Sequence, residues 1–447
     1  MAREEPITSP IHRFLKLGSL VGRVGASVAS SRALDMTLRE ATRQARRTEN
    51  LVRNATRIVE TLGEMKGAAM KVGQMLSLQE GLLPPEVAEV FRALQKEAPK
   101  VPAEVMRYEV EGSLGGKIDE LFSEFEGEAF AAASIGQVHR ARLPDGRRVA
   151  VKIQYPAIDQ IVKADLGNLK RLFAGLVGLF SDIDFEPIWR EVRDRLLEEI
   201  DYRKEAENMR VAADLYRDMP EILAPGVIAE RSSEHVLTME YLEGLSPAEA
   251  CSDRQPAELR DAWGAALFEF MMRGLFDWRY LHADPNLANF SFLPDGRIIV
   301  YDFGCMKRVS EGLAAGYAGL FLAALEHRFD EIPQLLRAIG VHTQDGEPLS
   351  HEFVDPYVEL FAEILRPDPP YTYGEDDDLY QKLMDLGMSN WSRAMDIEFP
   401  EDIIFIDRTL GGHFGNLSRL RATAPWRDLV RKHAERARLA GSRAVVR

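Results

Sequence analysis

The sequence contains little cysteine: only Cys251 and Cys305 occur among its 447 residues. Two thiols cannot build a disulfide framework or a four-ligand zinc site, which favours a reducing compartment. No uncharged apolar run reaches about 18 residues, so no transmembrane helix is expected. The N-terminus carries Glu4 and Glu5 and has no long apolar core, so neither a signal peptide nor a transit peptide is expected. These absences predict a cytoplasmic protein whose membrane contact would be peripheral, on the inner face.

The chain also has no overall excess of basic residues. The net charge of −15 argues against nucleic acid as a partner. Residues 11–30 differ from this average, because they place apolar side chains on one helical face and Arg13, Lys16 and Arg23 largely elsewhere. This pattern predicts a basic amphipathic helix that either lies on an anionic membrane or packs on its own protein.

The most informative stretch is His282–Gly304, which holds two acids and an amide: Asp284, Asn289 and Asp302. Alternating apolar residues around Pro294-Asp295-Gly296 predict a β-hairpin that brings Asp302 close to Asn289. Carboxylate and amide oxygens that converge in this way suit Mg²⁺, with Asn289 and Asp302 as its ligands. Asp284, on the loop before the hairpin, is then the residue that accepts a hydroxyl proton or orients a water.

The spacing D-x4-N followed by D-F-G is that of the catalytic core of the protein-kinase-like superfamily. A lone DFG also occurs in ordinary surface turns that lead into strands. The H-x-D-x4-N element at the right distance upstream therefore carries the prediction.

A second hairpin with chemical meaning follows Glu128, with its turn at Pro144-Asp145-Gly146. In protein kinases a glycine-rich loop and a strand lysine occupy these places. Lys152 supplies the lysine, which is predicted to bind the α and β phosphates. The loop residues predicted to bind nucleotide are Ala131, Ala132, Ala133, Ser134 and Val138. Because alanine restricts φ and close backbone approach, the loop should be stiffer than a glycine-rich one.

One long amphipathic helix is expected from Glu186 to about Leu215, and it carries several acids. On a straight helix Asp201 and Glu205 share a face, whereas Glu199 points away from both. We therefore predict that Glu205 is the ion-pair partner of Lys152. The alternative is a solvated acidic face.

Two strands are expected next, around Gly226–Glu230 and Glu234–Tyr241. The second leads into a segment resembling a kinase hinge, in which backbone groups of Glu240 and Leu242 would bind adenine. The rest of the chain is largely helical and contains a second pattern, FPEDIIFIDRTLGGHFG, at Phe399–Gly415.

Together these residues resemble the UbiB/ADCK (AarF-domain) family of atypical kinase-like proteins, which are associated with ubiquinone and related isoprenoid-quinone lipids. The resemblance runs from about Thr61 through the core and more loosely through the C-terminal helices. The motifs that carry it are Lys71-Val72-Gly73-Gln74, the alanine-rich AAASIGQVHRA, Lys152, Glu199-Ile200-Asp201 with Glu205, HADPNLANF and DFG.

The resemblance implies roles that the residues alone do not. Read alone, Lys71 and Gln74 belong to a solvated helix face. In the family this KxGQ helix contacts the E-x-D acids, here Glu199 and Asp201, and occupies space that a protein substrate would need. The resemblance also implies ATP and Mg²⁺ as cofactors. As partners it implies quinone-precursor lipids or quinone-biosynthesis proteins.

The predicted fold is α+β, a two-lobed protein-kinase-like fold in three parts. Residues 1–115 would form a helical extension with the KxGQ helix and the membrane-interface helix. Residues 116–245 would form the N-lobe with a helical insertion, and residues 246–447 a helix-rich C-lobe.

Two features argue against phosphorylation of proteins in trans. Asn286 stands where protein kinases usually carry a lysine that steadies the γ-phosphate, and no clear A-P-E follows DFG. The favoured function is a Mg²⁺-dependent ATPase or a small-molecule or lipid kinase that supports isoprenoid-quinone biosynthesis or lipid homeostasis. Two alternatives stay open: an aminoglycoside-type phosphotransferase for a small metabolite, and a pseudokinase scaffold that binds nucleotide without turnover.

Overall fold

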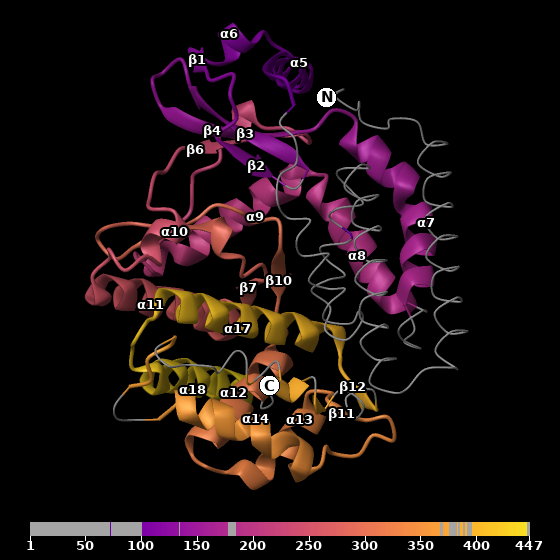
Figure 1. Cartoon of the computed structure of the whole chain (residues 1–447), viewed down its shortest axis with the longest axis vertical. Helices are drawn as coiled ribbons and strands as arrows, with labels where there is room; N and C mark the ends of the chain where they lie inside the picture. The colour runs from indigo at the N-terminus through magenta and orange to yellow at the C-terminus, as the bar shows by residue number, and fades with distance from the viewer. Residues whose placement is uncertain are drawn as a thin grey trace, which may run out of the picture. The chain divides into compact units, whose positions relative to one another are not determined.

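The computed structural model describes Val72 and residues 101–133, 135–177, 185–366, 370–374, 382, 385–387, 389–390 and 396–444. The chain divides into two compact units. Unit 1 runs to Ala206 and takes in Val227–Tyr241, and unit 2 holds Glu207–Gly226 and the chain from Leu242 onward. The elements of both are labelled in Figure 1. The helix predicted over residues 11–30 lies outside the described residues, as do Lys71, Gln74 and Ser134.

Unit 1 is built on a five-stranded antiparallel sheet in the order β1-β3-β4-β6, with β2 pairing with β3. Its strands are β1 (Glu124–Phe125), β2 (Ala131–Ala133), β3 (Gly136–Arg142), β4 (Arg148–Gln154) and β6 (Val236–Glu240). The predicted β3–β4 hairpin is present, and its turn uses Gly146 at φ 91°. Glycine adopts this left-handed conformation without the Cβ clash that other residues meet.

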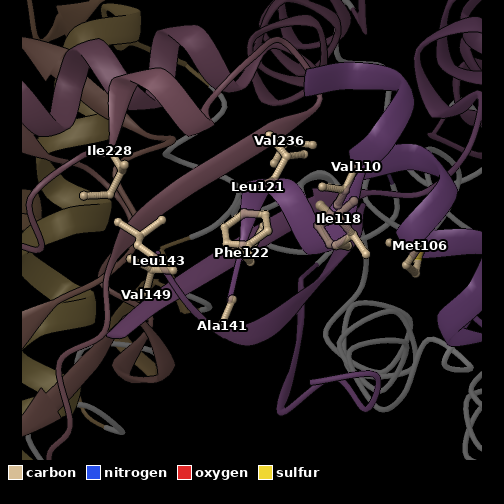
Figure 2. Close-up of a cluster of buried hydrophobic side chains, with 12 residues drawn as sticks. Met106, Val110, Ile118, Leu121, Phe122, Ala141, Leu143, Val149, Ile228 and Val236 are labelled. Carbon is tan, nitrogen blue, oxygen red and sulfur yellow. The ribbon is translucent and has the colours of Figure 1, made fainter. Parts of the chain in front are cut away.

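The apolar core of unit 1 lies against one face of this sheet. Successive strand residues point to opposite faces, so Val149, Val151 and Ile153 share a face of β4 and are fully buried. They pack with Met106 and Val110 of α5 (Ala103–Leu114) and with the short helix α6 (Ile118–Leu121). Figure 2 shows this cluster. The same alternation sends Lys152 to the other face of the sheet.

Three helices follow β4 along the chain: α7 (Ile158–Val177), α8 (Phe185–Glu199) and α9 (Tyr202–Leu215). The helices α7 and α8 pack side by side (Figure 1). The single helix predicted from Glu186 to Leu215 is wrong, because the chain leaves helical geometry at Ile200 and Asp201. The Asp201 carboxylate accepts from the backbone N–H of Arg203 at 3.0 Å, as a helix N-cap does. Asp201 and Glu205 therefore do not share a face of one straight helix as predicted, although Glu205 does lie on α9.

The strand predicted around Gly226–Glu230 is also wrong. Val227 makes one isolated antiparallel bridge to Met239, and Ala229–Arg231 forms a 3₁₀ turn, η3. The strand predicted around Glu234–Tyr241 is present as β6.

Unit 2 combines small sheets with helices. A three-stranded sheet has the order β5-β9-β8, β7 pairs with β10, and β11 pairs with β12. The strands are β5 (Ile222–Leu223), β7 (Tyr280–His282), β8 (Phe290–Phe292), β9 (Ile298–Val300), β10 (Met306–Arg308), β11 (His342–Thr343) and β12 (Ile397–Glu398). The antiparallel pair β8–β9 is the hairpin predicted around Pro294-Asp295-Gly296, and its turn uses Gly296 at φ 90°.

The helices of unit 2 carry several of its buried aromatic side chains, among them Trp263, Phe268 and Trp426. Besides the end of α9, the α-helices of unit 2 with described bounds are α10 (Pro247–Ala250), α11 (Ala257–Met272), α12 (Glu311–Leu325), α13 (Ile332–Ala338), α14 (His351–Ile364), α17 (Glu401–Leu420) and α18 (Trp426–Ala444). The shorter turns are η2 (Tyr216–Asp218), the π-helical η4 (Arg273–Asp277), η5 (Leu287–Asn289) and η6 (Phe329–Glu331).

The mixture of helix and sheet confirms the predicted α+β class. Within the described residues, no helix is both long and apolar enough to cross a bilayer.

Candidate active-site residues

A buried ion pair in unit 1 joins Lys152 of β4 to Glu205 of α9. The Lys152 Nζ donates to both carboxylate oxygens of Glu205, at 2.8 and 2.9 Å. The two side chains are only 11% and 6% exposed. A buried charge is costly unless it is paired, so this contact lowers the cost of burying both groups.

The alanine-rich loop continues the same row of side chains across the sheet. Val138 lies directly opposite Lys152 on the neighbouring strand, and Ala131 lies directly opposite Val138. Residues in register on adjacent strands point to the same face, so Val138 and Ala131, two of the residues predicted to bind nucleotide, share the face of Lys152. Ala132 points to the opposite face, whereas Ala133 returns to that of Ala131.

Tyr202 is a residue beside the lysine that the sequence analysis missed. Its ring centroid lies 5.1 Å from the Nζ of Lys152, within the range of a cation–π contact. A Cβ on Gly136 would lie 2.2 Å from the carbonyl oxygen of Ile153 and 3.1 Å from the Tyr202 hydroxyl. Glycine is therefore required at 136 for close strand pairing. The only sequence signal for Tyr202 was its position three residues before Glu205, which sets the two side chains on one face of α9.

The acids predicted to meet the KxGQ helix lie at the break between α8 and α9. Asp201 pairs with Arg203 through two contacts of 2.9 Å, and this guanidinium holds the pKa of the Asp201 carboxyl below its usual value. Arg203 also lies 3.2 Å from a carboxylate oxygen of Glu234. Glu199 is the last residue of α8 and is half-buried. Their predicted partners Lys71 and Gln74 are not among the described residues, so the regulatory contact stays a prediction.

At the predicted hinge, Glu240 ends β6 in unit 1, and Tyr241 follows it with its ring beside two arginines. The guanidinium of Arg148 lies 4.5 Å from the ring centroid, and Arg140 Nε donates to the Tyr241 hydroxyl at 3.0 Å. In unit 2, the Leu242 carbonyl accepts from the Tyr301 hydroxyl at 3.0 Å. The Leu242 carbonyl thus already accepts a hydrogen bond within the protein. Adenine binding by this segment stays a prediction.

Asn289 and Asp302 lie at the open end of the β8–β9 hairpin in unit 2. Phe290 pairs with Val300, and Tyr301 N–H donates to the Asn289 carbonyl at 2.9 Å. Asp302 therefore follows directly on the residue bonded to Asn289. Both Asn289 and Asp302 are half-buried.

The orientation of these groups fits a hard cation. Asn289 Nδ2 donates to the Asp284 carbonyl at 3.3 Å, which leaves the amide oxygen as its atom for metal binding. Asp302 Oδ1 accepts from the Gly304 N–H at 2.9 Å, and a Cβ on Gly304 would lie 3.2 Å from this oxygen. One carboxylate and one amide are the protein ligands expected for Mg²⁺ that also binds phosphates and water. Within the described residues, no group of three or more His, Cys, Asp or Glu side chains is placed to hold a metal ion.

Asp284 lies on the loop between β7 and η5 and is half-buried. Its Oδ1 accepts from the N–H of Asn286 at 3.3 Å. The Asn286 side chain in turn accepts from Ala288 N–H at 3.1 Å and caps η5. Asn286 therefore shapes the loop, in contrast to the lysine of protein kinases, which contacts phosphate.

Asn208, on the part of α9 that belongs to unit 2, is a second residue that the sequence analysis missed. Its Nδ2 donates to the carbonyl of Phe303 at 2.9 Å, and its Oδ1 accepts from the hydroxyl of Tyr280 at 2.7 Å. One amide thus joins the start of β7, which leads to Asp284, to the DFG segment. The partners lie 72 and 95 residues away, so local spacing gave no signal for it.

Comparison with known proteins identifies the class to which this geometry belongs. The model of the ABC1 atypical kinase-like domain matches residues 93–336, which is more than half of the chain. The chain belongs to this family, and the predicted UbiB/ADCK membership is confirmed.

Relatives and a solved structure agree with this assignment. The chain is 32% identical over 380 residues to "Atypical kinase coq-8, mitochondrial" of Caenorhabditis elegans, covering 83% of this chain and 49% of the worm protein. It is 31% identical over 383 residues to rat "Atypical kinase COQ8B, mitochondrial", covering 84% of this chain and 71% of the rat protein. It thus spans about half the length of the first of these relatives. A Mycobacterium tuberculosis protein, Rv3197, was solved as a complex with erythromycin and is 32% identical to this chain, with a TM-score of 0.63. The match covers 83% of this chain and 93% of the Rv3197 chain.

Proposed function

We propose that this chain is a Mg²⁺-dependent atypical kinase-like enzyme that binds ATP and either hydrolyses it or transfers phosphate to a small molecule or lipid. The observation that carries the proposal is the buried Lys152–Glu205 ion pair, at 2.8 Å, in a kinase-like domain. In this superfamily such a lysine binds the α and β phosphates and is held in place by the glutamate. A pseudokinase scaffold has no need of the complete set, which also includes Asp284, Asn289 and Asp302.

Each residue has a definite role in this proposal. Lys152 binds phosphate oxygens, and Glu205 fixes the position of its ammonium group. Asn289 and Asp302 would hold Mg²⁺, which supplies charge neutralisation at the phosphates when it is bound. Asp284 accepts the proton of the attacking hydroxyl or water.

The acceptor is proposed to be water or a small hydroxylated lipid precursor in isoprenoid-quinone metabolism. The relatives whose printed names include COQ8 support a quinone pathway, and Asn286 and the alanine-rich loop argue against peptide substrates. The experiment is phosphate release from ATP with and without anionic liposomes and quinone-like phenols, for wild type and Asp302→Asn. Release that Asp302→Asn abolishes supports the proposal, and equal release from both proteins contradicts it.

A small-metabolite phosphotransferase is the second candidate. The similar protein Rv3197 was solved in complex with erythromycin, which favours hydroxylated small molecules as ligands to test. Transfer of phosphate to such a compound, without stimulation by phenols or liposomes, would favour this candidate.

Peripheral membrane binding through residues 1–30 is proposed on the sequence pattern alone. Liposome co-sedimentation should fall when these residues are deleted. Equal sedimentation would mean that this segment does not bind lipid.

A further inference from the structure

The pattern at Phe399–Gly415 has no part in the function proposed so far, yet the structure places it at the catalytic loop. It forms most of α17, which belongs to unit 2 like the loop itself. Lys307 of β10 lies with its Nζ 4.6 Å from the ring centroid of Phe405 on α17. Figure 1 shows α17 beside β7 and β10, the strands on either side of the catalytic core.

Two residues of α17 contact Pro285, the residue directly after Asp284. Asn416 Nδ2 donates to the Pro285 carbonyl at 2.6 Å, and Asn416 is only 5% exposed. A Cβ on Gly412 would lie 2.3 Å from Cγ and 2.8 Å from Cβ of Pro285. Gly412 and Asn416 are four residues apart, which places them on one face of the helix. This face of α17 contacts Pro285, which directly follows Asp284, the predicted proton acceptor.

The neighbouring Gly411 shows that the close approach is specific to one glycine. A Cβ on Gly411 would have no atom of the described residues within 4 Å beyond its own helix backbone and chain neighbours. Glycine within a helix costs about 1 kcal/mol relative to alanine. At 412 the contact with Pro285 explains that cost, whereas no contact with another described residue requires glycine at 411.

His413, also on α17, packs beside the catalytic loop. Its ring packs edge-on against Phe290 at 6.0 Å between centroids, and Phe290 in turn contacts the ring of His282. His413 is 1% exposed, and neither of its ring nitrogens has a hydrogen-bond partner within the described parts of the chain. Burial, with a smaller contribution from His282, lowers the pKa of His413 to about 3. The ring is therefore neutral near pH 7 and packs as an apolar group.

The helix itself is held from its other side. Asp407 accepts from the buried hydroxyl of Tyr317 on α12 at 2.7 Å. A helix anchored in this way can restrain the loop that it contacts.

We propose that α17 is the positioning element of the catalytic loop, with Gly412 and Asn416 fixing the peptide after Asp284. Neither residue touches the reacting atoms, so both act through Asp284. This proposal rests on the proposed role of Asp284 and names the residues that hold Asp284 in position.

The test compares Gly412→Ala with the matched variant Gly411→Ala, and adds Asn416→Ala in case Gly412→Ala fails to fold. Amide hydrogen exchange of the full-length protein is followed in the peptide that contains residues 282–290. We expect exchange there to speed up by about tenfold or more in Gly412→Ala and Asn416→Ala, because a loop that loses its contacts opens more often. Gly411→Ala should exchange like wild type. Unchanged exchange in both contact variants, or equal acceleration in Gly411→Ala, would overturn the proposal.

A second readout separates positioning from a general loss of structure. In Gly412→Ala and Asn416→Ala the turnover of ATP should fall by about 100-fold, the loss expected when a reacting group is misplaced by about 1 Å. The affinity for Mg²⁺-ATP should stay within about threefold, since neither residue is a proposed ligand. Affinity that falls in parallel with turnover would overturn the positioning role. If wild type neither binds nor turns over nucleotide, the proposed function fails, whereas hydrogen exchange still decides whether α17 holds the loop.

Discussion

Glu205 receives two hydrogen bonds from a single ammonium group, that of Lys152, and both side chains are almost completely buried. A surface ion pair contributes little to stability. A buried pair differs, because removal of one partner leaves the other charged and without compensation.

The first prediction follows from this difference. Lys152→Met should lower the free energy of unfolding by about 3 kcal/mol, because it removes the ammonium group that donates two hydrogen bonds to the buried Glu205 carboxylate. The double variant Lys152→Met/Glu205→Gln should recover much of this loss. Chemical denaturation measures both, and Lys163→Met on the exposed face of α7 serves as the control, with a change within about 0.5 kcal/mol. If Glu205→Gln alone is measured as well, additive effects of the two single changes would show that the pair is not coupled.

The second prediction concerns the ring beneath Lys152. Tyr202→Leu should weaken binding of Mg²⁺-ATP by about fivefold, since it removes a cation–π contact worth roughly 1 kcal/mol. Tyr202→Phe keeps the ring and should bind like wild type. Isothermal calorimetry compares the two, and equal loss in both would assign the effect to the hydroxyl group.

The third prediction concerns the alanine-rich loop. Ala131→Gly and Ala133→Gly restore backbone freedom on the face that Ala131 shares with Lys152. They should change the preference between ATP and ADP or release autophosphorylation. Nucleotide titration and phosphate incorporation measure these outcomes, and unchanged behaviour in both variants would contradict the role given to the alanines.

The fourth prediction is a pH dependence. The pKa of His413 is about 3 in the folded protein and about 6.5 when unfolded. Below pH 6.5 the unfolded chain therefore binds a proton that the folded protein does not, and stability falls by about 1.4 kcal/mol per pH unit down to about pH 3. Above pH 6.5 the histidine is neutral in both states and contributes no pH dependence.

His413→Leu removes this proton and provides the measurement. The difference in unfolding free energy between His413→Leu and wild type should be constant above pH 7. It should shift in favour of the variant as pH falls from 6 to 4. Parallel stability curves over the whole range would show that His413 is not held neutral.

Much of the local structure around the predicted site residues was predictable from sequence because it depends on local rules. The two Pro-Asp-Gly turns fixed hairpins with glycine at φ 91° and 90°. Those hairpins set Lys152 on its strand and Asn289 near Asp302. The alternation along β4 also separated the lysine from the apolar core.

The remainder depended on contacts that no local pattern reports. The break at Ile200–Asp201 interrupts a continuous apolar periodicity, so the sequence indicated one helix. Asn416 and Pro285 are 131 residues apart, and only the paired glycines at 411 and 412 hinted at close packing there. Such long-range packing is set by the tertiary fold and became visible only in the structure.

The most direct test of the central claim is thermal unfolding with Mg²⁺-ATP for wild type, Asp302→Asn and the control Asp295→Asn. Asp295 is exposed at the hairpin tip, where it pairs with Arg297, and it has no part in the proposed site. At ATP concentrations of about 100 times Kd, wild type and Asp295→Asn should gain about 2.7 kcal/mol of stability. Chelation of the metal should abolish this gain, and Asp302→Asn should lack it from the start. An absence of stabilisation in wild type with every divalent metal, or an equal gain in Asp302→Asn, would contradict the account.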